Sequence, residues 1–378
     1  MAAREPRILG VRRLSWRRPR LSVVVPVYNV SRYVGAALES VLAQPLREIS
    51  AIELIVVDDG STDASREIVS RLAATDRRVT LLTQANGGVS AARHAGIAAA
   101  TGDLLTFVDP DDVLRPDAWS GMLRTLRRTG SDFVVGSAER VTDDGSRFVT
   151  PLMRRNHAHE RLAVSIEEAP LMLADVFAWN KIFDRRFWVE NRISFPLRTR
   201  YQDQVALTQA FLSADRFDVV TDVVYDWRVR GDGTSATQRR GQLANLRERI
   251  ATKRQTLELV RAHGSPALMD ALVTEVLPID MWQHFRAAVH PLVESPEEYW
   301  RLLRGMVREF WYDAGVPFER TTVPPAQRVM AWLVAGDRRG DLARWIDMID
   351  RLGGPARALE QNPFRDEQTY PPALVPAA

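Results

Sequence analysis

The sequence predicts an α/β fold: a mostly parallel sheet with helices on both faces, followed by an α-helical C-terminal region. Three observations lead to this fold class. Short, continuously apolar segments alternate with amphipathic segments from Leu21 to Gly136, as in a sheet buried on both sides. Polar residues follow directly after several of the apolar segments. From Gln242 onwards, apolar residues recur at helical spacing only.

The individual strands are recognised as apolar runs and the helices as the segments between them. We expect strands at residues 21–27, 53–57, 79–83, 104–108 and 132–136. We expect helices at 33–44, after the Ser61–Asp63 cap, at 89–100 and from Pro116. Four polar segments follow strand ends: Tyr28-Asn29, Asp58-Asp59, Asn86 and Asp109–Asp112. Since parallel sheets bind ligands at the carboxyl ends of their strands, these segments predict a site at one edge.

The chain divides into four predicted parts. Residues 1–20 form a basic N-terminal arm, 21–240 the α/β domain, 241–365 a helical region and 366–378 a tail or linker. Helices are expected at 243–261, 266–275, 295–314 and 325–352. Residues 150–240 are less regular and include the turn-rich segment Arg230–Ser235.

The composition excludes several classes of protein. Of the 378 residues, 46% are hydrophobic, which is enough for a sizeable core. The absence of cysteine excludes disulfide-stapled mini-folds, thiolate metal sites and cysteine nucleophiles. No apolar run is long enough to span a membrane. The net charge is only +3, and arginine accounts for all but two of the 51 basic residues, so we expect no nucleic-acid partner.

A cluster of five arginines stands directly before the first strand: Arg12, Arg13, Arg17, Arg18 and Arg20. Two interpretations of this basic arm stay open, namely contact with anionic lipid or polymer and a solvated tail. The apolar segment Val23–Val27 is too short for the core of a secretory signal. We therefore expect a cytoplasmic protein, with peripheral contact at the inner membrane face as an option.

The sharpest chemical feature is Asp109-Pro110-Asp111-Asp112, directly after an expected strand. Alternate carboxylates at a strand end can face one hard cation, and Mg²⁺ or Mn²⁺ combines such oxygen ligands with substrate phosphates. The pattern predicts a metal ion that holds a diphosphate. The alternative is a solvated acidic turn that caps the following helix.

Two further segments carry groups that suit a nucleotide. Asp58 and Asp59 can accept hydrogen bonds from ribose hydroxyls or a base N–H, and Gly60 permits a tight turn. Helix capping by Ser61–Asp63 is the alternative interpretation. In the later segment Gln84–Gly96, two glycines allow close backbone approach, and an arginine follows on the next helix.

That arginine, Arg93, has a planar guanidinium that can pair with phosphate oxygens, although a solvated helix face is the alternative. Asp203, within Tyr201-Gln202-Asp203-Gln204, is a candidate general base. The alternative for Asp203 is a favourable charge at the start of a helix over Gln204–Leu212.

Several blocks together resemble glycosyltransferase family 2. They are PVYNVSRYVGAALESVLAQ, IVVDDGSTDASREIV, NGGVSAARHAGIAAATGDLLTFVDPDD, WNKIF and YQDQ, from about Leu21 to Arg239. The resemblance implies the GT-A fold, which is a Rossmann-like nucleotide-binding domain. It also implies transfer of a sugar from a nucleotide diphosphate donor, with inversion and with Mn²⁺ or Mg²⁺ as cofactor. The last two blocks are similar to the subgroup that decorates wall teichoic acid and related polyol-phosphate or capsular polymers.

The resemblance also implies roles for the site residues. The residues that would hold the nucleotide, including base, ribose and diphosphate, are Pro26, Tyr28, Asp58 or Asp59, Asn86 and Arg93. Asp109 and Asp111 would form the D-x-D pair, with Asp111 the more direct metal ligand. Asp112 would face the sugar and Asp203 would be the base.

Two positions depart from the family pattern. The base motif usually has Glu before Asp, whereas this chain has Gln202, so the role of the acidic neighbour is lost or moved. His94 replaces the usual Asn after the arginine of the third block. The helical region carries no motif that we can match, and its expected role is either self-association or docking of the acceptor.

The sequence thus predicts a hexosyl- or N-acetylhexosaminyltransferase, with a UDP-sugar as the default donor and a polymer or glycan as acceptor. The alternative is a non-catalytic carbohydrate-binding or scaffold protein with a decayed site. A phosphatase of the haloacid dehalogenase type needs a lysine near the phosphate, and only Lys181 precedes the helical region. A dinucleotide oxidoreductase needs G-x-G-x-x-G after the first strand, where this chain has PVYNVSR.

Overall fold

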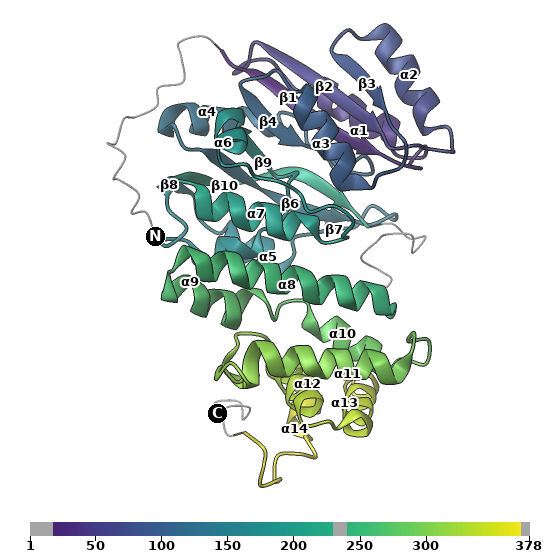
Figure 1. Cartoon of the computed structure of the whole chain (residues 1–378), viewed down its shortest axis with the longest axis vertical. Helices are drawn as coiled ribbons and strands as arrows, with labels where there is room; N and C mark the ends of the chain where they lie inside the picture. Colours follow the sequence, from purple (N-terminus) through teal and green to yellow (C-terminus); the bar gives the residue numbers. More distant parts are fainter. Residues whose placement is uncertain (1–17, 230–239, 372–378) are drawn as a thin grey trace. The chain divides into compact units, whose positions relative to one another are not determined.

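The structure is a computed structural model that describes residues 18–229 and 240–371. Most of the basic arm, the segment Arg230–Ser235 and the end of the tail therefore lie outside the described residues. The chain forms two compact units (Figure 1). The first unit consists of residues 1–168, 177–198 and 209–229, and the second of residues 169–176, 199–208 and 230–378.

The first unit is built on a ten-stranded mixed sheet. Eight of its strands follow the order β3-β2-β1-β4-β9-β6-β10-β5, and the other two, β7 and β8, pair with β6 and β10 respectively. The strands are β1 (Arg20–Val27), β2 (Ala51–Asp58), β3 (Val79–Thr83), β4 (Leu104–Phe107), β5 (Val113–Leu114), β6 (Phe133–Val141), β7 (Arg147–Phe148), β8 (Arg161–Val164), β9 (Lys181–Asp184) and β10 (Phe217–Arg228). Strands β1 to β4 are mutually parallel, and β9 runs against its neighbours β4 and β6. Six of the ten strands share one direction.

Helices cover both faces of the parallel strands. The helices that follow β1 to β5 are α1 (Val34–Leu42), α2 (Ser65–Thr75), α3 (Val89–Ala99) and α4 (Ala118–Thr129). On one face, Val23 and Val25 of β1 share a buried cluster with Leu38 of α1. Side chains alternate along a strand, so Val24 points to the opposite face. There it meets Gly96 of α3 so closely that a Cβ on the glycine would lie 2.4 Å from a Val24 methyl group.

The predicted fold class is confirmed, because a sheet of mostly parallel strands with helices on both faces is followed by a helical region. The predicted strands correspond to β1, β2, β3, β4 and β6, whereas β9 and β10 were not predicted. Strand β9 is only four residues long and lies in an aromatic segment, and β10 has irregular pairing with β6 between Val219 and Tyr225. Neither strand shows a regular apolar period that would reveal it.

Three more helices accompany the sheet: α5 (Pro151–Asn156), α6 (Arg185–Glu190) and α7 (Gln202–Ser213). Helix α7 begins in the second unit and ends in the first. An aromatic cluster fills the sheet face on the side of α6; its members include Phe107, Phe133, Phe183, Trp188, Phe195, Phe211 and Phe217.

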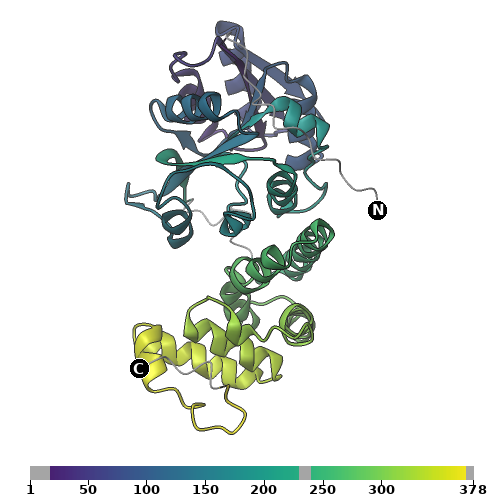
Figure 2. The same ribbon diagram turned by 90° about the vertical axis from the view of Figure 1, so that its left-hand side faces the viewer.

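The second unit is helical in its described part (Figure 2). Its elements are η1 (Pro170–Ala174), α8 (Leu243–His263), α9 (Pro266–Ala271), η2 (Leu272–Val276), α10 (Met281–Ala288), α11 (Pro296–Val307), η3 (Arg308–Tyr312), η4 (Phe318–Arg320), α12 (Pro325–Ala335), α13 (Arg339–Arg351) and α14 (Pro355–Glu360). None of the helices in the described ranges combines the length and apolarity needed to cross a membrane.

One predicted helix is wrong in its extent. The expected helix over residues 325–352 is two helices, α12 and α13, because the chain turns at Gly336–Arg338. Asp337 adopts a left-handed conformation with φ of 62°, and its carboxylate accepts a hydrogen bond of 2.6 Å from the indole N–H of Trp300. A side-chain contact from a distant helix thus stabilises a break that the apolar periodicity does not reveal. Helix α10 was also not predicted.

A histidine without a charge lies in the core of the second unit. His284 is fully buried, and its Nδ1 lies 2.9 Å from the hydroxyl of Tyr299, which donates to the carbonyl of Arg240 at 2.9 Å. Because the hydroxyl has one proton, it accepts from Nδ1–H, and Nε2 carries the lone pair. Burial lowers the pKa of His284 to about 3, although the nearby Asp280 carboxylate opposes this effect.

We expect acid to destabilise the protein through His284. The pKa of this imidazole is about 3 in the folded protein against 6.5 ordinarily, so the unfolded chain binds the proton first. Between these two pH values, each pH unit of acidification costs about 1.4 kcal/mol from this group. Urea unfolding at pH 7 and pH 5 measures the loss, and His284→Gln, which cannot titrate, should lose less. Equal pH slopes for both proteins would contradict the assignment.

Candidate functional site

The predicted polar segments meet at the carboxyl ends of the parallel strands. Their loops are joined by backbone hydrogen bonds: Asp59 N–H donates to the Val27 carbonyl at 2.8 Å, and Gln84 N–H donates to the Asp58 carbonyl at 3.0 Å. Val108 N–H, at the end of β4, donates to the Val24 carbonyl at 3.1 Å. These bonds bring the loops after β1, β2, β3 and β4 to one edge of the sheet.

The two adjacent aspartates after β2 bind different parts of the protein. The fully buried carboxylate of Asp58 accepts from the Arg66 guanidinium at 2.7 Å and from the Ser61 N–H at 3.3 Å. The Asp59 carboxylate accepts from the backbone N–H groups of Gly87 and Gly88, both at 2.8 Å. Asp58 therefore organises its own turn, whereas Asp59 fixes the glycine loop that leads into α3.

Gly60 allows these two loops to approach each other. Its φ is +77°, and a Cβ at this position would lie 3.0 Å from the backbone nitrogen of Asn86. Both the conformation and the close approach favour glycine. Asn86 itself is exposed in the loop that Asp59 holds.

The loop after β1 combines an exposed aromatic ring with a tight turn. Pro26 is buried within β1, whereas Tyr28 is 48% exposed. Asn29 has a positive φ of 50°, and its side-chain oxygen accepts from the backbone N–H of Thr62 at 2.8 Å. The loop is thus tied to the β2 loop, and the Tyr28 ring is left accessible at the same edge.

Arg93 projects from α3 into the protein and contacts the aspartate motif. The residue is only 1% exposed, its guanidinium lies over the Phe195 ring at 4.8 Å, and its Nη2 donates to Asp109 Oδ1 at 3.0 Å. A solvated helix face is therefore not its position. The pairing places a buried positive charge directly beside the first carboxylate of the D-x-D pair.

The aspartate motif holds three carboxylates in graded burial. Asp109 and Asp111 are partly exposed, whereas Asp112 is 2% exposed. Burial raises the pKa of Asp112 well above its ordinary value, and the charges of Asp111 and Asp109 act in the same direction. The Asp112 carboxylate accepts from the Arg228 backbone N–H at 2.7 Å.

Tyr225 links the two ends of this motif. Its hydroxyl accepts from the Asp109 N–H at 3.0 Å and donates to the Asp112 carboxylate. Its ring stacks on Trp179 of the WNKIF block, with ring centroids 4.2 Å apart. Sequence reasoning did not identify Tyr225, because its role depends on a contact across 116 positions.

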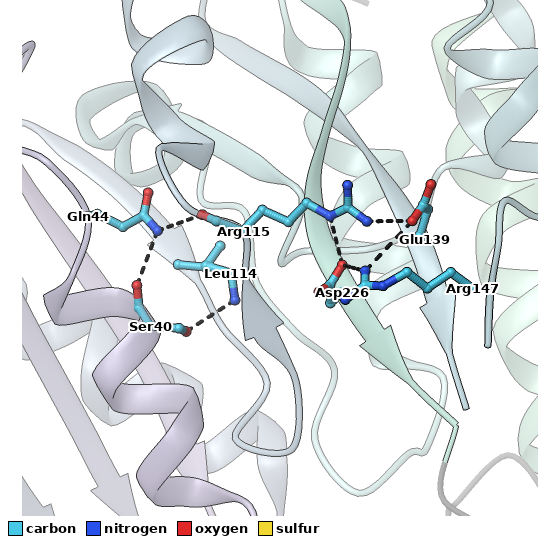
Figure 3. Close-up of polar contacts among 7 residues, drawn as sticks. All are labelled: Ser40, Gln44, Leu114, Arg115, Glu139, Arg147 and Asp226. Carbon is cyan, nitrogen blue, oxygen red and sulfur yellow. Dashed lines mark hydrogen bonds and ion pairs between the residues drawn. The ribbon is translucent and has the colours of Figure 1, made fainter. Parts of the chain in front are cut away.

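An ion-pair network fixes the chain directly after the motif (Figure 3). Val113 and Leu114 form β5, which pairs with β10. The next residue, Arg115, donates to Asp226 of β10 at 2.8 Å and also pairs with Glu139 of β6. Arg147 binds the same Asp226 at 2.7 Å.

On the other side of β5, helix α1 and the residues just after it supply two contacts, as Figure 3 shows: the Ser40 hydroxyl accepts from the Leu114 N–H at 3.1 Å, and the Gln44 amide donates to the Arg115 carbonyl at 2.8 Å. The chain that follows the aspartate motif is therefore held from both sides of β5.

These donors fit a divalent metal only if a substrate completes the shell. The described residues contain no group of three or more His, Cys, Asp or Glu side chains arranged to hold a metal ion. Asp109 and Asp111 offer hard carboxylate oxygens that remain partly accessible. Mg²⁺ commonly binds through one or two carboxylates together with substrate phosphates, so this donor set suits a metal that arrives with a diphosphate.

Asp203 belongs to the second unit, where it lies in the first turn of α7. Its side chain is partly exposed, whereas the flanking Gln202 and Gln204 are buried. With its nitrogen turned inward, the Gln202 amide donates to the carbonyl oxygens of Thr199 and Arg200 at 2.7 and 2.8 Å. The departure from the family pattern thus has a local explanation, because a carboxylate cannot donate to these carbonyls.

Comparison with known proteins finds a family match in the first part of the chain. Residues 22–184 match the family model described as Glycosyl transferase family 2. EpsH of Bacillus subtilis is 32% identical over 216 residues, which are 56% of this chain and 61% of EpsH. The glycosyltransferase GlyA of Streptococcus pneumoniae is 27% identical over 270 residues, which are 65% of this chain and 38% of GlyA. The chain thus spans less than two thirds of the length of either relative.

Two solved structures share the fold. S. aureus TarS 1–349 in complex with UDP-GlcNAc has a TM-score of 0.65 at 20% identity, with 89% of this chain and 92% of that chain covered. The mannosyltransferase PcManGT from Pyrobaculum calidifontis, in complex with GDP-Man and Mn²⁺, has a TM-score of 0.50 at 18% identity, with 86% and 88% covered. The likeness identifies the first unit as a GT-A fold.

We expect this chain to tolerate poorly the glutamate that the family carries before its base. In Gln202→Glu, a carboxylate faces two carbonyl oxygens that formerly accepted hydrogen bonds. The free energy of unfolding should fall by about 1–3 kcal/mol at pH 7, and by less at pH 4, where a protonated glutamate can donate once.

Chemical denaturation of the variant at both pH values measures this effect. Gln255→Glu, at an exposed position of α8 in the same unit, is the matched control and should change stability little. Equal stability of wild type and Gln202→Glu at pH 7 would be inconsistent with the donated hydrogen bonds.

Proposed function

We propose that this chain, whose residues 22–184 match the family model of glycosyl transferase family 2, is an inverting, metal-dependent glycosyltransferase. It moves a hexosyl or N-acetylhexosaminyl group from a UDP-sugar to a hydroxyl of a cell-wall or capsular glycopolymer, such as a teichoic acid. The proposal includes a cytoplasmic location, since nucleotide sugars are used there.

One observation carries the proposal: the aspartate motif, the buried Arg93 and the glycine loop held by Asp59 lie at one edge of the parallel strands. This arrangement offers acidic oxygens for a metal, a fixed cation and a glycine loop of fixed conformation within one site. The shared fold with TarS bound to UDP-GlcNAc and with PcManGT bound to GDP-Man and Mn²⁺ supports a nucleotide sugar as donor.

The nucleotide is assigned to the loops after β1, β2 and β3. Its proposed contacts are Pro26, Tyr28, Asp58 or Asp59, and Asn86. Tyr28 presents an exposed ring, which suits stacking on a base. Asp59 sets the conformation of the loop that carries Asn86, so its proposed contribution includes shaping this loop as well as any direct contact with the nucleotide.

The diphosphate and the sugar are assigned to the aspartate motif. Asp109 and Asp111 would hold Mn²⁺ or Mg²⁺, which when bound would offset the charge that grows on the leaving diphosphate. Arg93 adds a fixed positive charge beside Asp109. Asp112, whose carboxyl group is held by Tyr225 and Arg228, is assigned to the sugar.

The proposed reaction is a single displacement. Asp203 accepts the proton of the acceptor hydroxyl while that oxygen attacks the anomeric carbon. The bond between the anomeric carbon and the diphosphate oxygen breaks, and UDP leaves. Attack opposite to the leaving group inverts the configuration at this carbon.

We expect donor binding to depend on Mn²⁺ and on Asp111. In a thermal-shift assay, UDP-GlcNAc with Mn²⁺ should stabilise the wild-type protein more than either alone, by about 2.7 kcal/mol when the donor is at 100 times its Kd. Asp111→Asn should lose the Mn²⁺-dependent part. Asp117→Asn, in the exposed turn that follows the motif, is the control and should keep it. A panel of UDP- and GDP-sugars in the same assay identifies the donor, and no stabilisation by any of them would contradict the proposal.

We expect Asp203→Asn to remove turnover and to leave donor binding near the wild-type value. General-base assistance accounts for about 10²–10⁴-fold in rate, so UDP release from the donor should fall by that factor. The change in stability should be small, about 0.3–1 kcal/mol from the lost charge at the helix start. Asp215→Asn, an exposed aspartate beyond the end of α7, should retain full activity. Wild-type turnover in Asp203→Asn would remove this residue from the mechanism.

A further inference from the structure

The chain around Asp203 is held by one stripe of helix α8. Arg200 donates to both carboxylate oxygens of Glu248, through its backbone N–H at 2.9 Å and its guanidinium at 3.0 Å. The Tyr201 hydroxyl donates to Asn245 Oδ1 at 2.7 Å. On the other side of Asp203, the Gln204 side-chain oxygen accepts from Arg249 at 2.6 Å.

These three partners occupy one face of α8. Glu248 and Arg249 lie three and four positions after Asn245, so each of them is a neighbour of Asn245 on the helix surface. Their contacts reach the positions before and after the aspartate, so the backbone of Asp203 is restrained from both directions. All of these residues belong to the second unit.

Arg249 is the most firmly held member of this stripe. Its guanidinium pairs with Asp280 and lies 4.6 Å from the centre of the Tyr201 ring. About one helical turn after Arg249, the fully buried Lys253 donates to the same Asp280 at 2.9 Å and to the Leu277 carbonyl at 2.5 Å. Burial disfavours the ionised form of Asp280, but the charges of Arg249 and Lys253 outweigh it and hold the pKa of this carboxyl well below its ordinary value.

The arrangement leaves Asp203 itself accessible. Gln202 and Gln204 are 5% and 4% exposed, whereas Asp203 between them is partly exposed. The side chains of Gln202 and Gln204 are therefore fixed inside the protein, whereas the Asp203 side chain keeps part of its surface exposed. A general base must lie within hydrogen-bonding distance of the proton that it removes, and a displacement of about 1 Å can cost about 10²-fold in rate.

We propose that the helical unit is a working part of the transferase, in which the Asn245–Glu248–Arg249 stripe of α8 sets the position of Asp203 and Arg249 is its principal positioning residue. This inference rests on the proposed function, because it takes Asp203 as the base. It gives the helical region a role that neither self-association nor docking of the acceptor supplies.

The test compares Arg249→Met with Arg254→Met. Arg254 lies on the same helix and makes an exposed two-bond pair with Glu309, at 2.7 and 2.6 Å, so its replacement removes an arginine and an ion pair away from Asp203. The assay is UDP release from UDP-GlcNAc in Mn²⁺ with a polyol-phosphate polymer as acceptor, well below the melting temperature of each variant. We expect kcat to fall about 10–100-fold in Arg249→Met, with the Kd for UDP-GlcNAc unchanged, and both to stay at wild-type values in Arg254→Met.

Two additional variants separate positioning from folding. Gln204→Met removes the same contact without disturbing the ion pair between Arg249 and Asp280, so it should lower kcat in the same direction if Arg249→Met fails to fold. In the double variant Asp203→Asn/Arg249→Met, the second change should add no further loss to the first, because Arg249 acts through Asp203. Hydrogen exchange of residues 199–208 should be faster in Arg249→Met than in Arg254→Met.

The outcomes distinguish the inference from the function on which it rests. If the wild-type chain releases no UDP from any nucleotide sugar, the proposed function fails and the inference with it. If the wild type is active and Asp203→Asn is not, while Arg249→Met and Gln204→Met keep wild-type kcat, the inference alone is overturned. Losses that multiply in the double variant, or a parallel loss of donor affinity in Arg249→Met, would also overturn it.

Discussion

The candidate site depends on the hydroxyl group of Tyr225. This hydroxyl accepts from the backbone of Asp109 and donates to the side chain of Asp112, so it bridges the two ends of a turn rich in negative charge. Three adjacent carboxylates repel one another, and burial of Asp112 adds to the cost. A neutral donor that is itself packed against Trp179 holds this turn without adding charge. The metal-binding and sugar-binding roles assigned to the motif therefore rest on a phenol that no charge pattern would reveal.

The part of the fold that could be predicted from the sequence is the part whose strands are recognisable as short apolar segments. Strands β1, β2 and β4 lie between two layers of helices, so most of their residues are buried and apolar, and β3 at the edge is shorter and less buried. Strands β9 and β10 could not be recognised in this way. Strand β9 is inserted antiparallel between β4 and β6, and β10 departs from regular register near Tyr225. Their pairing is decided by contacts between distant segments, which periodicity does not record. The break at Asp337 between α12 and α13 has the same origin.

The site divides along a similar line. Its acidic and glycine-rich segments could be located from the sequence, because each follows a strand end and parallel strands end at one edge. The role of each group could not be predicted in this way. The structure places Arg93 against Asp109 and directs the Asp59 carboxylate to the Gly87 and Gly88 N–H groups, and both pairings depend on how the loops fold over one another. Arg115 shows the same limit, since the partners that make it hold the aspartate motif are Asp226 and Glu139, far along the chain.

The helical unit holds three charged side chains in positions with little exposure, where a charge is costly in free energy. An apolar core is usually at least as stable as an ion cluster with little exposure, because desolvation of Lys253, Asp280 and Arg249 opposes their attraction. Stability alone therefore does not account for the cluster. Ion pairs and hydrogen bonds are directional where apolar contacts are not, so the cluster fixes the orientation of the Arg249 guanidinium. The guanidinium in turn contacts Gln204 and the ring of Tyr201, which lie on either side of Asp203 in the sequence. A fixed direction is what a proton acceptor needs, and an apolar core of equal stability would not provide it.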